Sequence, residues 1–154
     1  MKEKTLSVSA IKEGTVIDHI QPGQALKIVR LLCLSDQETR VTIGLNLKGK
    51  SGLKDLIKIE NAFLSESQAA QIAIFSPRAT VNVIENFKVA KKFPVSLPES
   101  ISSVLACPNF RCTTNQETLP TFFSIEENNH RITLRCKYCE KHFTREDLRE
   151  KTDV

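Results

Sequence analysis

The stretch CPNFRC at residues 107–112, followed by CKYC at residues 136–139, decides the fold of the C-terminal part of the chain. The two cysteines of each stretch are close enough to bend around one ion, and thiolates suit Zn²⁺. A redox CxxC pair with two bystanders, or a set of buried thiols, does not explain why both pairs fall within one short segment. The spacing therefore predicts one zinc ion held by Cys107, Cys112, Cys136 and Cys139.

This predicted zinc site is structural rather than catalytic. Four protein thiolates complete a tetrahedral shell and leave no position for an activated water. A segment this small rarely folds on its hydrophobic core alone, and zinc supplies roughly 10–16 kcal/mol in zinc-finger peptides. We expect a small β-rich domain of the zinc-ribbon or rubredoxin-like kind, with a hairpin turn at Asn128-Asn129. Its modest core would come from Phe122, Phe123, Ile125, Ile132 and Leu134.

The composition is that of an ordinary soluble globular protein, with 154 residues, 40% hydrophobic and 26% charged. These fractions argue against wholesale disorder. No apolar run approaches the ~20 residues of a membrane span, and the N-terminus does not resemble a signal peptide. The five cysteines are an odd count, which disfavours a disulfide framework. We therefore expect a cytoplasmic protein that does not insert into a membrane.

A proline-rich break divides the sequence. Pro94 and Pro98 enclose a short segment that discourages a continuing helix or central strand. We predict a first domain over residues 1–93, a linker over 94–98 and a second domain over 99–154, the alternative being a surface loop within one domain. The first part carries a net charge of +5 and the second −1, so the first is better suited to an anionic partner.

The first domain is predicted to be a split βαβ arrangement. Alternating or β-rich runs indicate strands near residues 6–10, 15–20, 41–47, 81–84 and 87–89, while 53–59 is ambiguous between strand and helix. Two runs at helical spacing indicate helices. One begins near Pro22 and places Cys33 in the core, and the other follows a capping box formed by Ser65 and Gln68. The expected fold is a ferredoxin-like α+β sheet with both helices on one face.

Residues 44–51, GLNLKGKS, match the phosphate-binding loop pattern letter for letter. A true loop of this kind needs a strand before its first glycine and a helix after its serine. Here the first glycine lies inside an alternating strand, and Gly52 follows the serine. We interpret the segment as a hairpin loop, with a nucleotide hydrolase as the less favoured alternative.

Other basic residues are better candidates for anion binding. Lys54 and Lys58 are four residues apart, which places both on one face of a strand or a helix. Lys91-Lys92 follows the last expected strand, and Asp18-His19 offers a carboxylate and an imidazole near the first strand. Their spacing in the sequence does not show whether they converge.

Several longer stretches carry a family resemblance. They are residues 10–20, AIKEGTVIDHI; 42–47, TIGLNL; 54–61, KDLIKIEN; 79–82, ATVN; and the two cysteine stretches described above. Together they resemble the regulatory chain of bacterial aspartate carbamoyltransferase over nearly the whole length.

This resemblance implies an allosteric role in pyrimidine biosynthesis without catalysis by the chain itself. The first domain would bind CTP as inhibitor or ATP as activator, and the zinc domain would dock onto a catalytic chain. The family assembly has two catalytic trimers joined by three regulatory dimers, in which the first domains pair as homodimers. The resemblance also implies that residues 44–51 belong to a hairpin between antiparallel strands.

The resemblance also assigns candidate binding residues. The base and ribose would lie near Val8, Ser9, Ala10, Ile11, Asp18, Lys58, Asn82, Ile84, Phe87 and Val89. The triphosphate would meet His19, Lys54 and Lys92. Contacts to the catalytic chain would come from Asn109, Arg111, Tyr138 and Lys141. Phe87 stands where the best-known relative has Tyr, and Arg111 stands where it has Asn.

Two rival functions follow from the same residues. A nucleic-acid-binding zinc ribbon would need a basic stripe with stacking aromatic residues, but the zinc half carries a net charge of −1. An enzyme, either an NTPase or a redox dithiol, would need a working phosphate loop or a metal-free CxxC pair. We therefore expect no nucleic-acid partner and no enzymatic activity.

Overall fold

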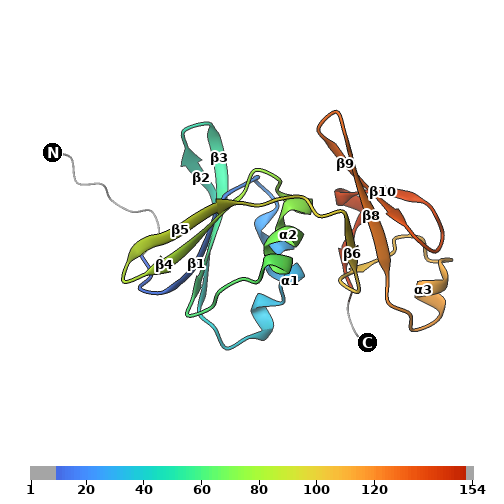
Figure 1. The fold of residues 1–154 in the computed structure, drawn as a ribbon, viewed down its shortest axis with the longest axis horizontal. Coiled ribbons are helices and arrows are strands. Elements are labelled where there is room, and N and C mark those ends of the chain that lie inside the picture. Colours follow the sequence, from blue (N-terminus) through green and yellow to red (C-terminus); the bar gives the residue numbers. More distant parts are fainter. Residues whose placement is uncertain (1–9, 152–154) are drawn as a thin grey trace. The chain divides into compact units, whose positions relative to one another are not determined.

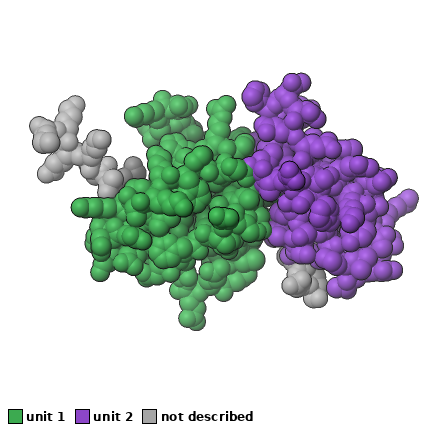
Figure 2. Space-filling view, in the orientation of Figure 1, with its two compact units in different colours: residues 1–96 green, residues 97–154 purple. Residues whose placement is uncertain are grey.

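The computed structural model describes residues 10–151 of the chain. The chain divides into two compact units, one ending at Ser96 and the other beginning at Leu97 (Figure 2). The strand predicted near residues 6–10 falls almost entirely outside the described residues. Within residues 10–151, no helix has both the length and the apolar character needed to cross a membrane.

The first unit is built on a five-stranded antiparallel sheet with the strand order β2-β3-β1-β4-β5. The strands are β1 (Gly14–Ile20), β2 (Val41–Gly49), β3 (Gly52–Glu60), β4 (Thr80–Glu85) and β5 (Lys88–Pro94). The helical elements are α1 (Ala25–Leu31), the short 3-10 helix η1 (Leu34–Asp36) and α2 (Glu66–Phe75). This order confirms the split βαβ prediction, with β5 added at one edge.

One face of this sheet carries the core of the unit. Ile17 of β1 lies opposite Ile57 of β3 and Val81 of β4, and all three side chains are almost fully buried. Helices α1 and α2 both lie on one side of the sheet (Figure 1), where they contribute the buried residues Ile28 and Ile72. Side chains alternate across a strand, so the residues between these positions point to the opposite, open face.

The helix boundaries confirm one prediction and correct another. The capping box is present, because the Ser65 hydroxyl accepts from the Gln68 amide and the Gln68 side chain accepts from the Ser65 amide. The prediction that Cys33 is a core residue on α1 is wrong. The helix ends at Leu31, and Cys33 takes a left-handed conformation with φ of 53° that leaves it exposed. Leu34, the next residue, is buried instead.

The segment that matches the phosphate-binding pattern is a β-hairpin. Residues 44–49 lie in β2, Lys50 and Ser51 form the turn, and β3 begins at Gly52. A strand therefore stands where a phosphate-binding loop requires a helix. The ambiguous segment 53–59 is a strand, part of β3.

The first unit extends slightly beyond the first predicted proline. Pro94 is the last residue of β5, and its partner across the ladder is Thr80. Val95 is buried, and its amide donates to the carbonyl of Ala79. The predicted linker at 94–98 thus overlaps the end of the first unit.

The second unit is β-rich. A four-stranded sheet has the order β10-β9-β8-β6, and β11 pairs with β7 beside it. The predicted hairpin is present, but its turn lies one residue later than Asn128-Asn129: Asn128 ends β8, and Asn129 and His130 form the turn, both with positive φ. Phe123 and Leu134 are fully buried, whereas Phe122 and Ile125 are only partly buried. The elements are β6 (Ser100–Ser102), β7 (Leu105–Ala106), α3 (Thr113–Gln116), β8 (Phe122–Asn128), β9 (Arg131–Cys136), β10 (His142–Thr144), the 3-10 helix η2 (Arg145–Asp147) and β11 (Arg149–Glu150).

Candidate functional site

The four cysteines of the second unit converge although they come from two distant stretches. Cys107 follows β7, Cys112 precedes α3, Cys136 ends β9, and Cys139 lies in the turn before β10. Their Sγ atoms all lie within 4.8 Å of one another. The Cys107 and Cys139 sulfurs are 3.7 Å apart, and the Cys112 and Cys136 sulfurs are 3.8 Å apart.

The separations of 3.7 and 3.8 Å match those of a tetrahedral thiolate site. Zn–S bonds of ~2.3 Å in a tetrahedron place neighbouring sulfurs about 3.8 Å apart. A disulfide requires sulfurs only about 2.05 Å apart, and all four thiols are free. The cluster is therefore positioned to bind one metal ion, and Zn²⁺ suits both the four-sulfur donor set and the geometry.

Burial opposes ionisation of these thiols, and a bound cation would favour it. Burial raises the pKa of the Cys107 thiol and of the Cys136 thiol. Burial acts in the same direction on Cys139, but hydrogen bonds such as that from the Lys141 amide outweigh it and bring the pKa of Cys139 to about 7. Since thiolates are the ligands, a bound dication would supply the positive charge that stabilises them.

Polar residues around the first cysteine loop hold it in shape. The Thr114 hydroxyl lies 3.2 Å from the Cys112 sulfur. The Asn115 side chain donates to the carbonyls of Cys107 and Asn109, at 2.8 and 2.7 Å. Sequence reasoning missed both residues, because their side chains act through the folded loop rather than through a ligand spacing. Such contacts around the ligands fix their orientation.

The open face of the first unit brings together polar residues from four strands. The ladder aligns Lys58 of β3, Val16 of β1, Asn82 of β4 and Lys92 of β5 in one row across the sheet. Opposed residues in such a ladder share a face, so the two lysines and the asparagine point to the side away from the helices. Asn82 donates to the carbonyl of Val16 at 3.2 Å.

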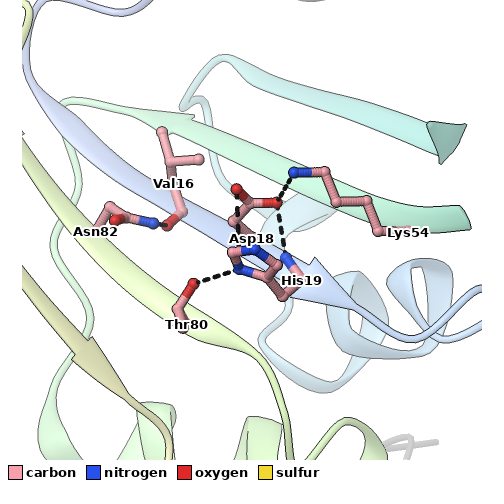
Figure 3. Close-up of polar contacts among 6 residues, drawn as sticks. All are labelled: Val16, Asp18, His19, Lys54, Thr80 and Asn82. Atoms are coloured by element: carbon pink, nitrogen blue, oxygen red, sulfur yellow. Dashed lines mark hydrogen bonds and ion pairs between the residues drawn. The ribbon is translucent and has the colours of Figure 1, made fainter. Parts of the chain in front are cut away.

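A second polar group lies one step along the same face. The Lys54 amine is 2.8 Å from the Asp18 carboxylate, and the His19 backbone amide donates to that carboxylate at 2.7 Å. His19 has φ of 57° at an irregularity of β1, and its Nδ1 lies 3.0 Å from the Thr80 hydroxyl. Figure 3 shows Lys54 and His19 converging on Asp18 from two sides. Sequence reasoning missed Thr80, which the ladder places opposite Asp18.

The ionisable groups on this face are shifted by their surroundings. Partial burial works to raise the pKa of Asp18, but Lys54 and the His19 amide outweigh it and hold that pKa below its usual value. Burial lowers the pKa of Lys58, which is only 9% exposed, and the Asp18 charge partly offsets that effect. A buried lysine of this kind is stabilised in its charged form by nearby negative charge.

The remaining predicted binding residues differ in their exposure. Ile11 and Ile84 are buried, whereas Ala10 and Val89 are exposed. Phe87 is 64% exposed in the turn between β4 and β5, with φ of 64°. Val8 and Ser9 lie outside the described residues.

Comparison with known proteins agrees with this geometry. Residues 6–96 match the family described as aspartate carbamoyltransferase regulatory chain, allosteric domain, and residues 99–149 match the metal binding domain of the same chain. The chain belongs to the aspartate carbamoyltransferase regulatory chain family. The second unit of this regulatory chain is thus a metal-binding domain, whose four cysteines are positioned to bind one ion.

Curated relatives are similar in sequence to this chain over nearly its full length. It is 49% identical over 150 residues to the aspartate carbamoyltransferase regulatory chain of Vibrio cholerae, covering 97% of each chain. It is 48% identical to that of Aeromonas hydrophila, covering 98% of this chain and 99% of the relative. It is 46% identical to that of Chromobacterium violaceum, covering 95% and 97%. Membership of this family implies a catalytic chain as partner.

The residues predicted to contact that partner lie on and next to the two cysteine loops. Asn109 and Arg111 belong to the first loop and Tyr138 to the second, and Lys141 lies two residues after the second. Arg111, Tyr138 and Lys141 are exposed, and Asn109 is partly buried.

One buried carboxylate of the regulatory chain was not anticipated. Asp55 is fully buried, and it accepts from the amides of Gly23, Ala25 and Asn46, at 3.0, 3.4 and 2.9 Å. It therefore ties β3 to the start of α1 and to the irregularity in β2. The only signal in the sequence is an acidic residue inside a strand-like run, where a charge is costly unless it is paired.

Proposed function

We propose that the first unit of this regulatory chain binds CTP and ATP on the open face of its sheet, CTP as inhibitor and ATP as activator. The second unit holds a structural zinc ion and carries the signal to catalytic chains. The assembly proposed is the family arrangement of two catalytic trimers and three regulatory dimers. The chain itself performs no catalysis. It works in the cytoplasm, where both nucleotides are found and where free thiols persist.

The row of Lys58, Asn82 and Lys92, flanked by Lys54 and His19, is the observation that carries this proposal. Four basic side chains on one face suit a triphosphate, and lysines act as point charges towards phosphate oxygens. Asp18 is a hydrogen-bond acceptor suited to a ribose hydroxyl. Backbone groups of residues 9–11 would read the edge of the base.

Regulation then follows from differential binding. A nucleotide shifts an equilibrium between two quaternary states only by as much as its affinities for the two states differ. The coupling free energy between such sites is typically ~1–3 kcal/mol, and the substrate must change nucleotide affinity by the same factor. CTP would favour the less active state and ATP the more active state.

Replacing Lys92 with Ala tests the nucleotide site directly. Lys92 is exposed, so the fold should be unaffected, while loss of one charge-assisted contact should raise the Kd for CTP by about 10-fold or more. Calorimetric titration of the full chain with CTP and with ATP measures this. The matched control is Lys50→Ala in the β2-β3 turn, which should bind both nucleotides normally. Loss of binding in the control with normal binding in Lys92→Ala would instead indicate a phosphate-binding loop.

The affinity for CTP should also depend on alkaline pH through Lys58. Burial lowers the pKa of Lys58, and only the protonated amine attracts the triphosphate. The affinity for CTP should therefore be highest below the pKa of Lys58 and fall as the pH rises through that pKa. Because this pKa is lowered, the loss of affinity should begin at a lower pH than for an exposed lysine. Arg stays charged, so a Lys58→Arg variant should lose this dependence. A pH profile of the Kd that is the same in both proteins would contradict the assignment.

A further inference from the structure

The first cysteine loop of the second unit exposes most of one aromatic side chain. Phe110 lies between Cys107 and Cys112 and is 77% exposed, more than any other large hydrophobic residue within residues 10–151. Burying a phenylalanine side chain is worth about 1.5–3 kcal/mol, so a partner that covered Phe110 would gain binding free energy of that order.

Hydrogen bonds hold the backbone of the loop that carries Phe110. The Cys112 amide donates to the Asn109 carbonyl, and the Arg111 amide donates to the Asn109 side chain. Asn115 ties the Asn109 carbonyl to that of Cys107. Cys107 and Cys112 are also two of the four metal ligands, which anchors both ends of the loop. A loop whose backbone is ordered before association loses less entropy on binding than a flexible one.

Arg111 lies beside Phe110 and adds a positive charge to the exposed surface of this loop. Its guanidinium lies 5.7 Å from the centre of the Phe110 ring, and it has no ion-pair partner among the described residues. In this position it can stack on the ring while its N–H groups remain available to a carboxylate. Arg and aromatic residues are enriched among the residues that dominate protein–protein affinity.

The second cysteine loop extends this surface. Cys139 contacts Cys107 through their sulfurs, and the Asn109 side chain hydrogen-bonds to Cys139. The second loop therefore lies against the first, and it adds Tyr138, which is 43% exposed. The charged residues of the two loops are Arg111 and Lys137, and Glu140 and Lys141 follow the second loop; together the four carry a net positive charge.

We propose that Phe110 is the central anchor of this regulatory chain on the catalytic chain, entering an apolar pocket whose rim carries a carboxylate for Arg111. This inference rests on the proposed function, because it takes the catalytic chain as the occupant of the surface. Its support is continuity with the predicted contact residues Asn109, Tyr138 and Lys141, together with the positive charge of Arg111, Lys137 and Lys141 on this surface.

The test measures the Kd of the full, zinc-loaded regulatory chain for the purified catalytic trimer from the same organism. Phe110→Ser should weaken binding by ~10- to 100-fold, the range of a central anchor. The matched control is Phe63→Ser, since Phe63 is a 55% exposed phenylalanine of the first unit, and it should bind as the parent chain does. Arg111→Gln should bind more weakly and with less dependence on salt. Zinc content and Tyr138 fluorescence verify the fold of the second unit in each variant, and circular dichroism verifies the fold of the first unit.

The outcomes separate the two proposals. A parent chain that does not bind the catalytic trimer would overturn the proposed function and this inference with it. A parent chain that binds, together with a folded Phe110→Ser variant of unchanged Kd, would overturn this inference alone. Equal weakening by Phe110→Ser and Phe63→Ser would also overturn it, because the effect would not be specific to the cysteine loop.

Discussion

Removal of the metal ion is expected to unfold the second unit and leave the first unit folded. The second unit has a small core, and four thiolates drawn together without a cation cannot all remain ionised. Metal binding supplies roughly 10–16 kcal/mol in comparable zinc peptides, which exceeds the stability of most small domains. The chain has one tyrosine, Tyr138, and no tryptophan, so its fluorescence reports on the second unit alone. Circular dichroism of α1 and α2 reports mainly on the first.

Two cysteine variants test whether the four-cysteine cluster is responsible. Cys112→Ser removes one ligand and should give a second unit that loses its fold and its zinc. Cys33→Ser changes an exposed thiol outside the cluster and should leave the zinc content and Tyr138 fluorescence unchanged. A second unit that kept its native fluorescence after complete removal of the metal would show that the ion is not structural.

Replacing Asp55 with Ala is expected to destabilise the first unit by about 3 kcal/mol or more. The substitution removes a buried carboxylate and leaves three backbone amides without their acceptor. Each buried donor left unpaired costs roughly 1–3 kcal/mol, less where the original bond is long, as at Ala25. Urea unfolding monitored by circular dichroism of the full chain gives the change in the free energy of unfolding.

Asp36→Ala is the matched control, because Asp36 is an exposed aspartate of the same unit. It should change the free energy of unfolding by less than about 0.5 kcal/mol. Asp55→Asn should fall between the two, since its amide keeps one oxygen acceptor. Equal stability of Asp55→Ala and Asp36→Ala would mean that water or a shifted backbone satisfies the three amides, and the structural role assigned to Asp55 would be wrong.

Patterns with a fixed local geometry were predictable from the sequence. The capping box at Ser65 and Gln68 is such a case, because both hydrogen bonds lie within one turn of helix. The cysteine spacing is another, since each pair needs only a short loop to reach one ion. The hairpin in place of a phosphate-binding loop followed from the glycine after Ser51.

Features that depend on tertiary contacts were not predictable in this way. Helical spacing placed Cys33 in the core, but the helix ends two residues earlier and a left-handed residue turns the side chain outward. The alignment of Lys58 with Asn82 and Lys92 depends on strand order and register, which the pairing of distant strands determines. The role of Asp55 depends on amides from three separate segments.

The central claim is that nucleotide binding on the first unit controls a catalytic chain held by the second. The most direct test is the reaction rate of catalytic trimers assembled with this chain and zinc, measured at subsaturating aspartate with and without CTP or ATP. We predict a lower rate with CTP and a higher rate with ATP, and a smaller response to both in assemblies containing Lys92→Ala. The account would be contradicted by an assembled complex that binds CTP and ATP in separate experiments but whose reaction rate neither nucleotide changes.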